Sequence, residues 1–95
     1  MSTNGRSIEE LIILKMMGLA FIDIRADAGK ESRTDRQVSK AFIISDLYHN
    51  IPGGLAHGVD ASDLLKEIYT RAKRHDVESY VKKTEAWARR SLENP

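Results

Sequence analysis

Apolar residues dominate the segment between Ser7 and Gly29, and their order along the chain predicts a first helix over residues 8–28. Ser7 is followed by Glu10 at the spacing of a capping box, in which each side chain satisfies a backbone donor near the other residue. Gly29 offers the left-handed position that commonly ends a helix. The isoleucines of this segment also suit a buried strand broken at Gly18, but its length and its two end signals favour a helix.

A second apolar pattern begins after Thr34 and predicts a helix that ends near Asn50. Thr34 and Gln37 repeat the capping-box spacing. The apolar residues that follow recur at intervals of three and four, which favours a helix over a strand; they are Val38, Ala41, Phe42, Ile44, Leu47, Tyr48 and Ile51. Pro52 disfavours helical dihedral angles at the residue before it, and two glycines follow, so we expect the chain to turn there.

Two further helices are predicted in the second half of the chain. Asp60 and Asp63 place carboxylates at a helix start, where they accept hydrogen bonds from unpaired amides and suit the positive end of the helix dipole. The apolar stripe of this helix is Leu64, Leu65, Ile68, Tyr69 and Ala72. A break near His75, with Asp76 as the next cap, precedes a last helix, whose apolar face carries Val77, Tyr80, Val81, Thr84, Trp87 and Ala88.

These patterns predict an all-α protein, a small bundle of about four helices. With 95 residues the chain has enough apolar material for one core, so we expect a single helical domain over residues 1–95. Residues 1–6 and 93–95 fall outside the helical patterns, and we expect both ends to be frayed.

The first predicted helix carries apolar residues around its whole circumference, which is typical of a helix enclosed by others. The other helices have wide apolar faces of their own. We therefore expect that the helices of one chain cannot shield the whole apolar surface of the first helix from water. We therefore expect a homodimer across a two-fold axis, or contact with another protein. The predicted contact residues are Leu11, Ile12, Leu14, Met16, Met17 and Phe21. The alternative is a compact monomer with this helix at its centre.

Composition narrows the classes of function. The absence of cysteine excludes disulfides, thiolate nucleophiles and cysteine-ligated metal clusters. The net charge of +1 gives no global field that attracts nucleic acid or an anionic membrane. The most apolar run, residues 11–22, includes Lys15 and is too short to cross a hydrocarbon layer of about 30 Å. We expect a cytoplasmic protein with no membrane partner, no metal and no cofactor.

Asp46, His49 and His57 are the candidate ligand-binding residues. Asp46 and His49 are one turn apart near the end of the second predicted helix, and His57 follows in the glycine-rich segment. An oriented imidazole of this kind serves as a general base or as part of a metal site. A metal site needs three or four converging ligands, however, and a histidine in a last helical turn also bonds an unpaired carbonyl group. The structural interpretation is the favoured one.

The segment from Arg71 to Arg90 has a net charge of +4 and is the candidate surface for nucleic acid. Its candidate contact residues are Arg71, Lys73, Arg74, Lys82, Lys83 and Arg90. Glutamates stand four residues before three of the cations, at Glu67, Glu78 and Glu85, so ion pairs along the helices can neutralise much of this charge. A solvated charged face is the favoured interpretation.

Together these observations predict a small non-catalytic protein-interaction or regulatory module, homodimeric through its first helix. Two alternatives stay open. One is a regulator that binds nucleic acid with its basic segment. The other is a small metal- or ligand-binding helical protein that uses Asp46, His49 and His57, and this second alternative keeps an enzymatic role open.

Overall fold

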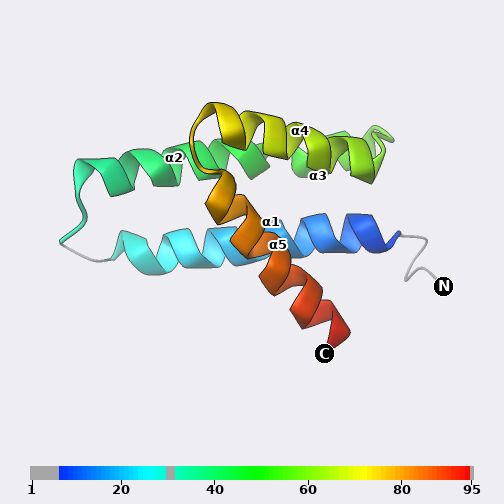
Figure 1. The fold of residues 1–95 in the computed structure, drawn as a ribbon, viewed down its shortest axis with the longest axis horizontal. Helices are drawn as coiled ribbons and strands as arrows, with labels where there is room; N and C mark the ends of the chain where they lie inside the picture. The colour runs from blue at the N-terminus through cyan, green and yellow to red at the C-terminus, as the bar shows by residue number, and fades with distance from the viewer. Residues whose placement is uncertain (1–6, 30–31, 95) are drawn as a thin grey trace.

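The structure is a computed structural model that describes residues 7–29 and 32–94, and within these ranges it contains helices, turns and caps but no strand. The helices are α1 (Ile8–Ala28), α2 (Asp35–His49), α3 (Ile51–Ala56), α4 (Ala61–Arg74) and α5 (Glu78–Glu93). The predicted all-α class is confirmed, with four long helices and the short α3 (Figure 1). Of the ends predicted to be frayed, residues 1–6 and Pro95 lie outside the described residues, whereas Glu93 belongs to the last turn of α5.

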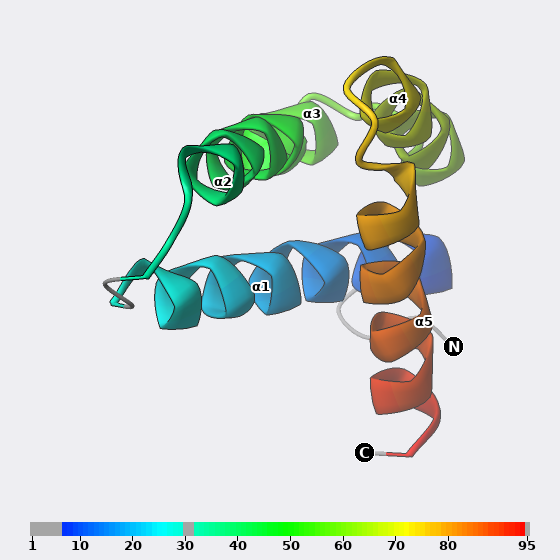
Figure 2. The ribbon, with the colours of Figure 1, turned by 60° about the vertical axis from the view of Figure 1, so that its left-hand side comes forward.

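The first helix is the central element of the bundle. α1 runs unbroken through Gly18, which excludes the strand interpretation, and it contacts each of the other helices. α2 returns beside the C-terminal half of α1, α3 and α4 lie along its N-terminal half, and α5 crosses it on one side (Figures 1 and 2). The radius of gyration, 13.8 Å, exceeds the about 12.4 Å of a compact domain of this length. The bundle is therefore elongated.

The core forms where α1 meets its neighbours. Four residues of α1, Ile12, Ile13, Met16 and Ala20, are at most 3% exposed and make up the covered face of this helix. They pack with Ile44, Leu47, Tyr48, Ile51, Leu64, Ile68, Ala72, Val77, Val81 and Ala88. The predicted stripes of the last two helices are thereby confirmed as their buried faces. Leu14, Met17, Leu19 and Ile24 of α1 are only partly buried and pack at the edge of this core.

The predicted helix starts form as the capping patterns indicate. The Ser7 hydroxyl accepts a hydrogen bond from the Glu10 amide at 3.2 Å. Thr34 and Gln37 form a complete capping box, with bonds of 3.2 and 2.8 Å between each side chain and the other residue's amide. Asp60 Oδ1 accepts bonds of 2.9 and 3.3 Å from the amides two and three residues later. Each of these caps satisfies backbone donors that the helix itself leaves unpaired.

The prediction that the chain turns immediately after Pro52 is wrong, because residues 51–56 form α3. Pro52 lies in the first turn of this helix, where its fixed φ and missing amide are tolerated. The turn comes later, at Gly58, whose φ is +82°. The Val59 amide donates to the Gly54 carbonyl at 3.0 Å, which is the long bond of a Schellman motif.

Asp76 ends α4 instead of capping α5, which corrects the prediction made for it. Its φ is +58°, and the Val77 amide donates to the Ala72 carbonyl at 2.9 Å, so Asp76 occupies the left-handed position that glycine usually fills. α5 begins after Val77 without a side-chain cap. The left-handed conformation predicted for Gly29 is also wrong, because its φ is −82°, although α1 ends at Ala28 as expected.

Candidate functional site

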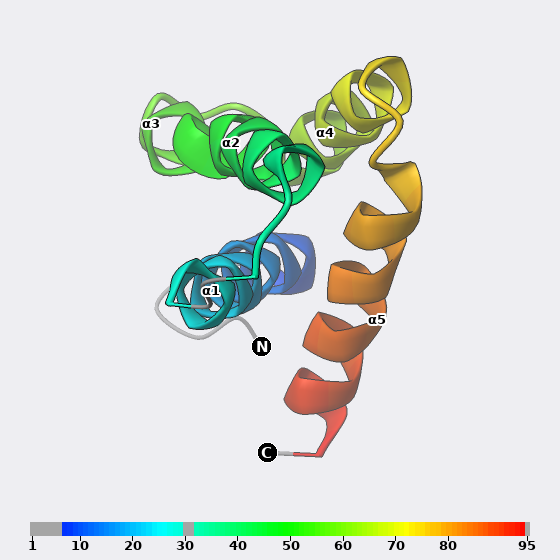
Figure 3. The same ribbon diagram turned by 90° about the vertical axis from the view of Figure 1, so that its left-hand side faces the viewer.

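α1 presents a stripe of apolar side chains on the outside of the molecule. Leu14, Met17, Phe21 and Ile24 follow one another at heptad spacing, so they share one side of the helix. Phe21 is 38% exposed and the other three are half-buried. Viewed along α1, the helices α4 and α5 lie to the right, α3 lies to the left of α2, and no described helix lies directly to the left of α1 (Figure 3). The partial exposure of these four side chains means that the other described helices cover this side of α1 incompletely.

α2 extends the apolar surface. Phe42 is 69% exposed, and Val38 lies one turn before it. A shallow groove of 180 Å³ joins the two helices, and it is lined by Ile24, Arg33, Val38, Ala41, Phe42 and Ser45. Because Ile24 belongs to the stripe of α1, the apolar side chains of the two helices adjoin. We refer to this surface as the outer face, made of Leu14, Met17, Phe21, Ile24, Val38, Ala41 and Phe42.

The six predicted dimer-contact residues lie in three different environments. Ile12 and Met16 are buried within the chain. Leu11, Leu14 and Met17 are half-buried, and Phe21 is exposed. The structure therefore places only Leu14, Met17 and Phe21 on the outer face. The predicted set omits Ile24 and the three residues of α2 that complete this face, Val38, Ala41 and Phe42.

The predicted ligand-binding residues do not form a cluster. Asp46 and His49 are exposed on α2, and His57 is exposed at the C-terminal end of α3. His49 lies two turns after Phe42, at the end of the outer face. Within residues 7–29 and 32–94, no three histidine, aspartate or glutamate side chains are placed to hold a metal ion. His57 lines a cavity together with residues that were not predicted to lie near it.

This cavity lies between α3 and α4 and has a volume of 470 Å³. Its apolar lining consists of Leu47, Ile51, Val59, Leu64 and Ile68, and its polar lining consists of Asn50, His57, Glu67 and Arg71. Gly53 and Gly54 of α3 complete the wall without adding side chains to it. The cavity exists because α3 continues beyond Pro52 and turns back at Gly58 to meet α4.

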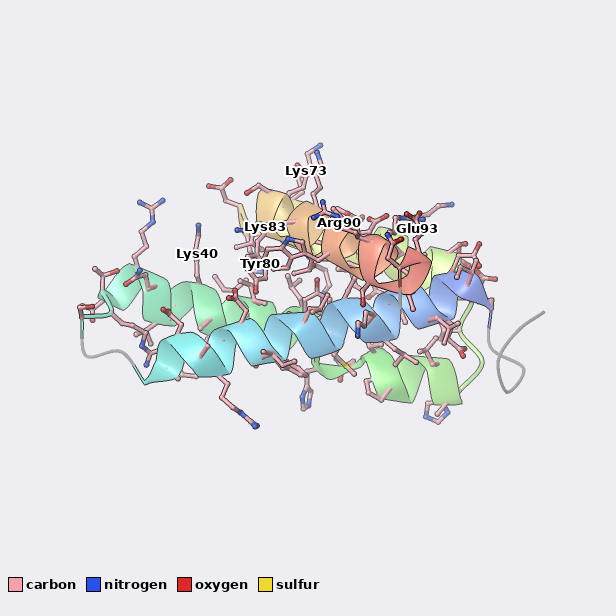
Figure 4. The ribbon with its side chains drawn as sticks, turned by 90° about the horizontal axis from the view of Figure 1, so that it is seen from below. Lys40, Lys73, Tyr80, Lys83, Arg90 and Glu93 are labelled. Atoms are coloured by element: carbon pink, nitrogen blue, oxygen red, sulfur yellow. The ribbon has the colours of Figure 1, made fainter. Side chains whose placement is uncertain are left out.

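The predicted basic residues are spread over α4 and α5. Arg71 lines the cavity, Lys73 and Arg74 are exposed in the last turn of α4, and Lys82, Lys83 and Arg90 are exposed on α5. Figure 4 shows Lys83 and Arg90 on α5, with Lys73 projecting away from the bundle. Lys83 Nζ lies 5.2 Å from the centre of the Trp87 ring, a cation–π contact.

Of the three ion pairs predicted along the basic segment, only Glu85 to Arg89 forms in the described part of the chain, at 2.8 Å. Tyr69 also donates a hydrogen bond to Glu85, at 2.5 Å, which links α4 to α5. Burial raises the pKa of the Glu85 carboxyl, but the hydrogen bonds from Tyr69 and Arg89 outweigh it and lower the pKa. This network holds two helices together and leaves Lys83 and Arg90 outside it.

Comparison of the chain with models of protein families, with curated proteins and with solved structures finds no match. Among the described helices, none combines the length and the apolar character needed to cross a membrane. The features of this chain that bear on its function are therefore the outer face, the cavity and the basic residues of α4 and α5.

Proposed function

We propose that the protein is a non-catalytic interaction module that forms a homodimer through the outer face. The observation that carries this proposal is the exposure of Phe42 next to the stripe of α1 that contains Phe21. Burial of one phenylalanine side chain contributes roughly 1.5–3 kcal/mol. A two-fold axis uses every contact residue twice, so the two phenylalanines of each chain contribute four buried rings to the dimer.

The exposed area of the chain is consistent with such an interface. The chain exposes 6601 Å², whereas a compact monomer of 10.7 kDa exposes about 5,500 Å². Each chain can therefore bury part of its exposed area in an interface. Its two exposed phenylalanines lie on α1 and α2.

The pairing of α1 with α2 also suggests how two copies meet. Two adjacent helices with an apolar outer side form one layer, and two such layers packed against each other make a four-helix bundle. The heptad spacing of the α1 stripe suits this packing. Ile12 and Met16 stay in the core of each protomer in this arrangement, so the contact set is Leu14, Met17, Phe21, Ile24, Val38, Ala41 and Phe42.

Sedimentation equilibrium over a concentration series tests the proposal. We expect the mass to rise from 10.7 kDa towards twice that value, and we expect Phe42→Asp to remain at 10.7 kDa. Ile8→Asp is the matched control, because Ile8 is 57% exposed but lies at the far end of α1. A wild-type mass of 10.7 kDa at every concentration would rule out the homodimer, and an equal effect of the two variants would rule out the outer face.

A second candidate function, nucleic-acid binding, is favoured by one side of α5. Lys83, Trp87 and Arg90 share this side, while Glu78 and Glu85 lie on another. Cations beside an aromatic ring are the side chains that bind phosphates and stack on bases. We expect Lys83→Gln/Arg90→Gln to weaken binding of a labelled single-stranded oligonucleotide at low salt, measured by fluorescence anisotropy. Absence of binding by the wild type at low salt would eliminate this function.

A further inference from the structure

The cavity between α3 and α4 has the size and the lining of a small-molecule site. Its 470 Å³ falls within the roughly 300–1,000 Å³ of ligand pockets. Four of its five apolar lining residues, Leu47, Ile51, Leu64 and Ile68, are each at most 9% exposed and belong to the core, whereas Val59 is 43% exposed. Such a wall offers a preformed surface to an apolar group without further ordering of side chains.

The polar side of the cavity contains an unpaired cation. Arg71 is half-buried, and its guanidinium makes no hydrogen bond or ion pair with any of the residues that the structure describes, although Glu67 lies one turn before it. A guanidinium has five donors in a planar fork that matches a carboxylate. His57 and Asn50 line the same cavity and supply further donors. A ligand with an acceptor at one end and an apolar body therefore matches both sides of the cavity.

We propose that this cavity binds an amphiphilic carboxylate, such as a medium-chain fatty acid. The apolar body lies on the wall formed by Leu47, Ile51, Leu64 and Ile68, and the carboxylate forms a bidentate pair with Arg71. Glu67 lines the cavity as well and repels the bound anion. The two charged residues of α4 therefore act on the ligand in opposite directions, so removing the charge of one weakens binding and removing the charge of the other strengthens it.

Titration calorimetry with octanoate tests the proposal directly. We expect Arg71→Gln to weaken octanoate binding about tenfold or more, because it removes charge-assisted hydrogen bonds. Glu67→Gln is expected to strengthen binding by about twofold to tenfold, because it removes the repulsion. Arg74→Gln is the matched control, since Arg74 is an exposed arginine of the same helix that does not line the cavity, and we expect it to leave the affinity unchanged.

Two further measurements separate this site from other modes of binding. Octanol lacks the carboxylate, so we expect it to bind at least about tenfold more weakly than octanoate. Amide chemical shifts of Gly53 and Gly54 are expected to move on octanoate addition, including in the Phe42→Asp background, because the cavity does not involve the outer face. No octanoate binding, equal affinity for octanol, equal effects of Arg71→Gln and Arg74→Gln, or shifts confined to residues around Phe42 would each overturn the proposal.

Discussion

Tyr48 of α2 and Thr84 of α5 are joined by a hydrogen bond of 3.0 Å inside the core. Both side chains are fully buried. Thr84 donates its single hydroxyl proton to the carbonyl oxygen of Val81 at 2.9 Å, so the Tyr48 hydroxyl is the donor in the bond between the two side chains. Burial raises the pKa of the Tyr48 phenol, which keeps this donor protonated. The bond connects two helices through residues that are 36 positions apart in the sequence.

The direction of this bond predicts unequal costs for removing its two ends. Tyr48→Phe leaves Thr84 bonded to Val81, so we expect a loss of about 1 kcal/mol in the free energy of unfolding. Thr84→Val leaves the Tyr48 hydroxyl buried without a partner, which costs about 1–3 kcal/mol for its desolvation in addition. Urea denaturation measures both, and we expect the double variant to be more stable than Thr84→Val alone. A larger loss for Tyr48→Phe than for Thr84→Val would contradict the assigned direction.

The tyrosines also predict how stability depends on pH in the alkaline range. Burial is the main cause that raises the phenol pKa of Tyr48, Tyr69 and Tyr80, with added contributions from the hydrogen bonds of Tyr69 to Glu85 and of Tyr80 to Asp23. The stability from a raised pKa is present below the unfolded value of 10.0 and is lost as the pH rises above it.

We therefore expect phenolate absorbance to appear together with the loss of helical circular dichroism when the protein is titrated above pH 10. These are the three tyrosines of the chain, so no other tyrosine contributes to the signal. A phenolate that forms with its ordinary pKa while the helical signal stays intact would contradict the expectation.

Two glycines are expected to respond to alanine in opposite directions. Gly58 has a φ of +82°, where a Cβ costs roughly 1–2 kcal/mol, so Gly58→Ala lowers the melting temperature. Gly18 lies inside α1, and a Cβ there meets no atom within 4 Å. Gly18→Ala therefore raises the free energy of unfolding by about 0.5–1 kcal/mol, because it reduces the flexibility of the unfolded chain. Thermal melts that show the same sign for both variants would contradict this account.

Local chemistry in the sequence was sufficient to predict most of the fold. Thr34 and Gln37, or Asp60 and the amides after it, interact over two or three residues, so their geometry depends little on the rest of the chain. Asp76 shows where such reasoning ends. Aspartate suits a helix start, but the Schellman motif that closes α4 requires a residue in the left-handed conformation at this position, and Asp76 adopts it.

The outer face was only partly predictable, because periodicity identifies a side of a helix but not its neighbour. Val38, Phe42 and His49 share one side of α2, as their spacing predicts. That side is the exposed one, whereas Ile44 and Leu47, which belong to the same apolar pattern, are buried in the core. Which of the two apolar sides is buried depends on where α1 and α4 lie, and this follows from packing between distant segments.

The acid range offers a separate prediction, which concerns Glu85. The hydrogen bonds from Tyr69 and Arg89 lower the carboxyl pKa below its ordinary 4.5, in spite of the opposing effect of burial. The stability that follows from a lowered pKa is present above 4.5 and is lost as the pH falls through the folded value. Glu85→Gln removes this contribution, so we expect the variant to be less stable than the wild type at pH 7.

The difference between Glu85→Gln and the wild type is expected to shrink as the pH falls below 4.5, because the wild type then loses the same charge. Denaturant unfolding at several pH values measures this difference. Glu93→Gln is the control for removing one carboxylate, since the Glu93 side chain is exposed and makes no hydrogen bond or ion pair with the residues that the structure describes. A difference for Glu85→Gln that is constant over this range would show that Glu85 acts by packing, because a contact that does not depend on ionisation does not change with pH.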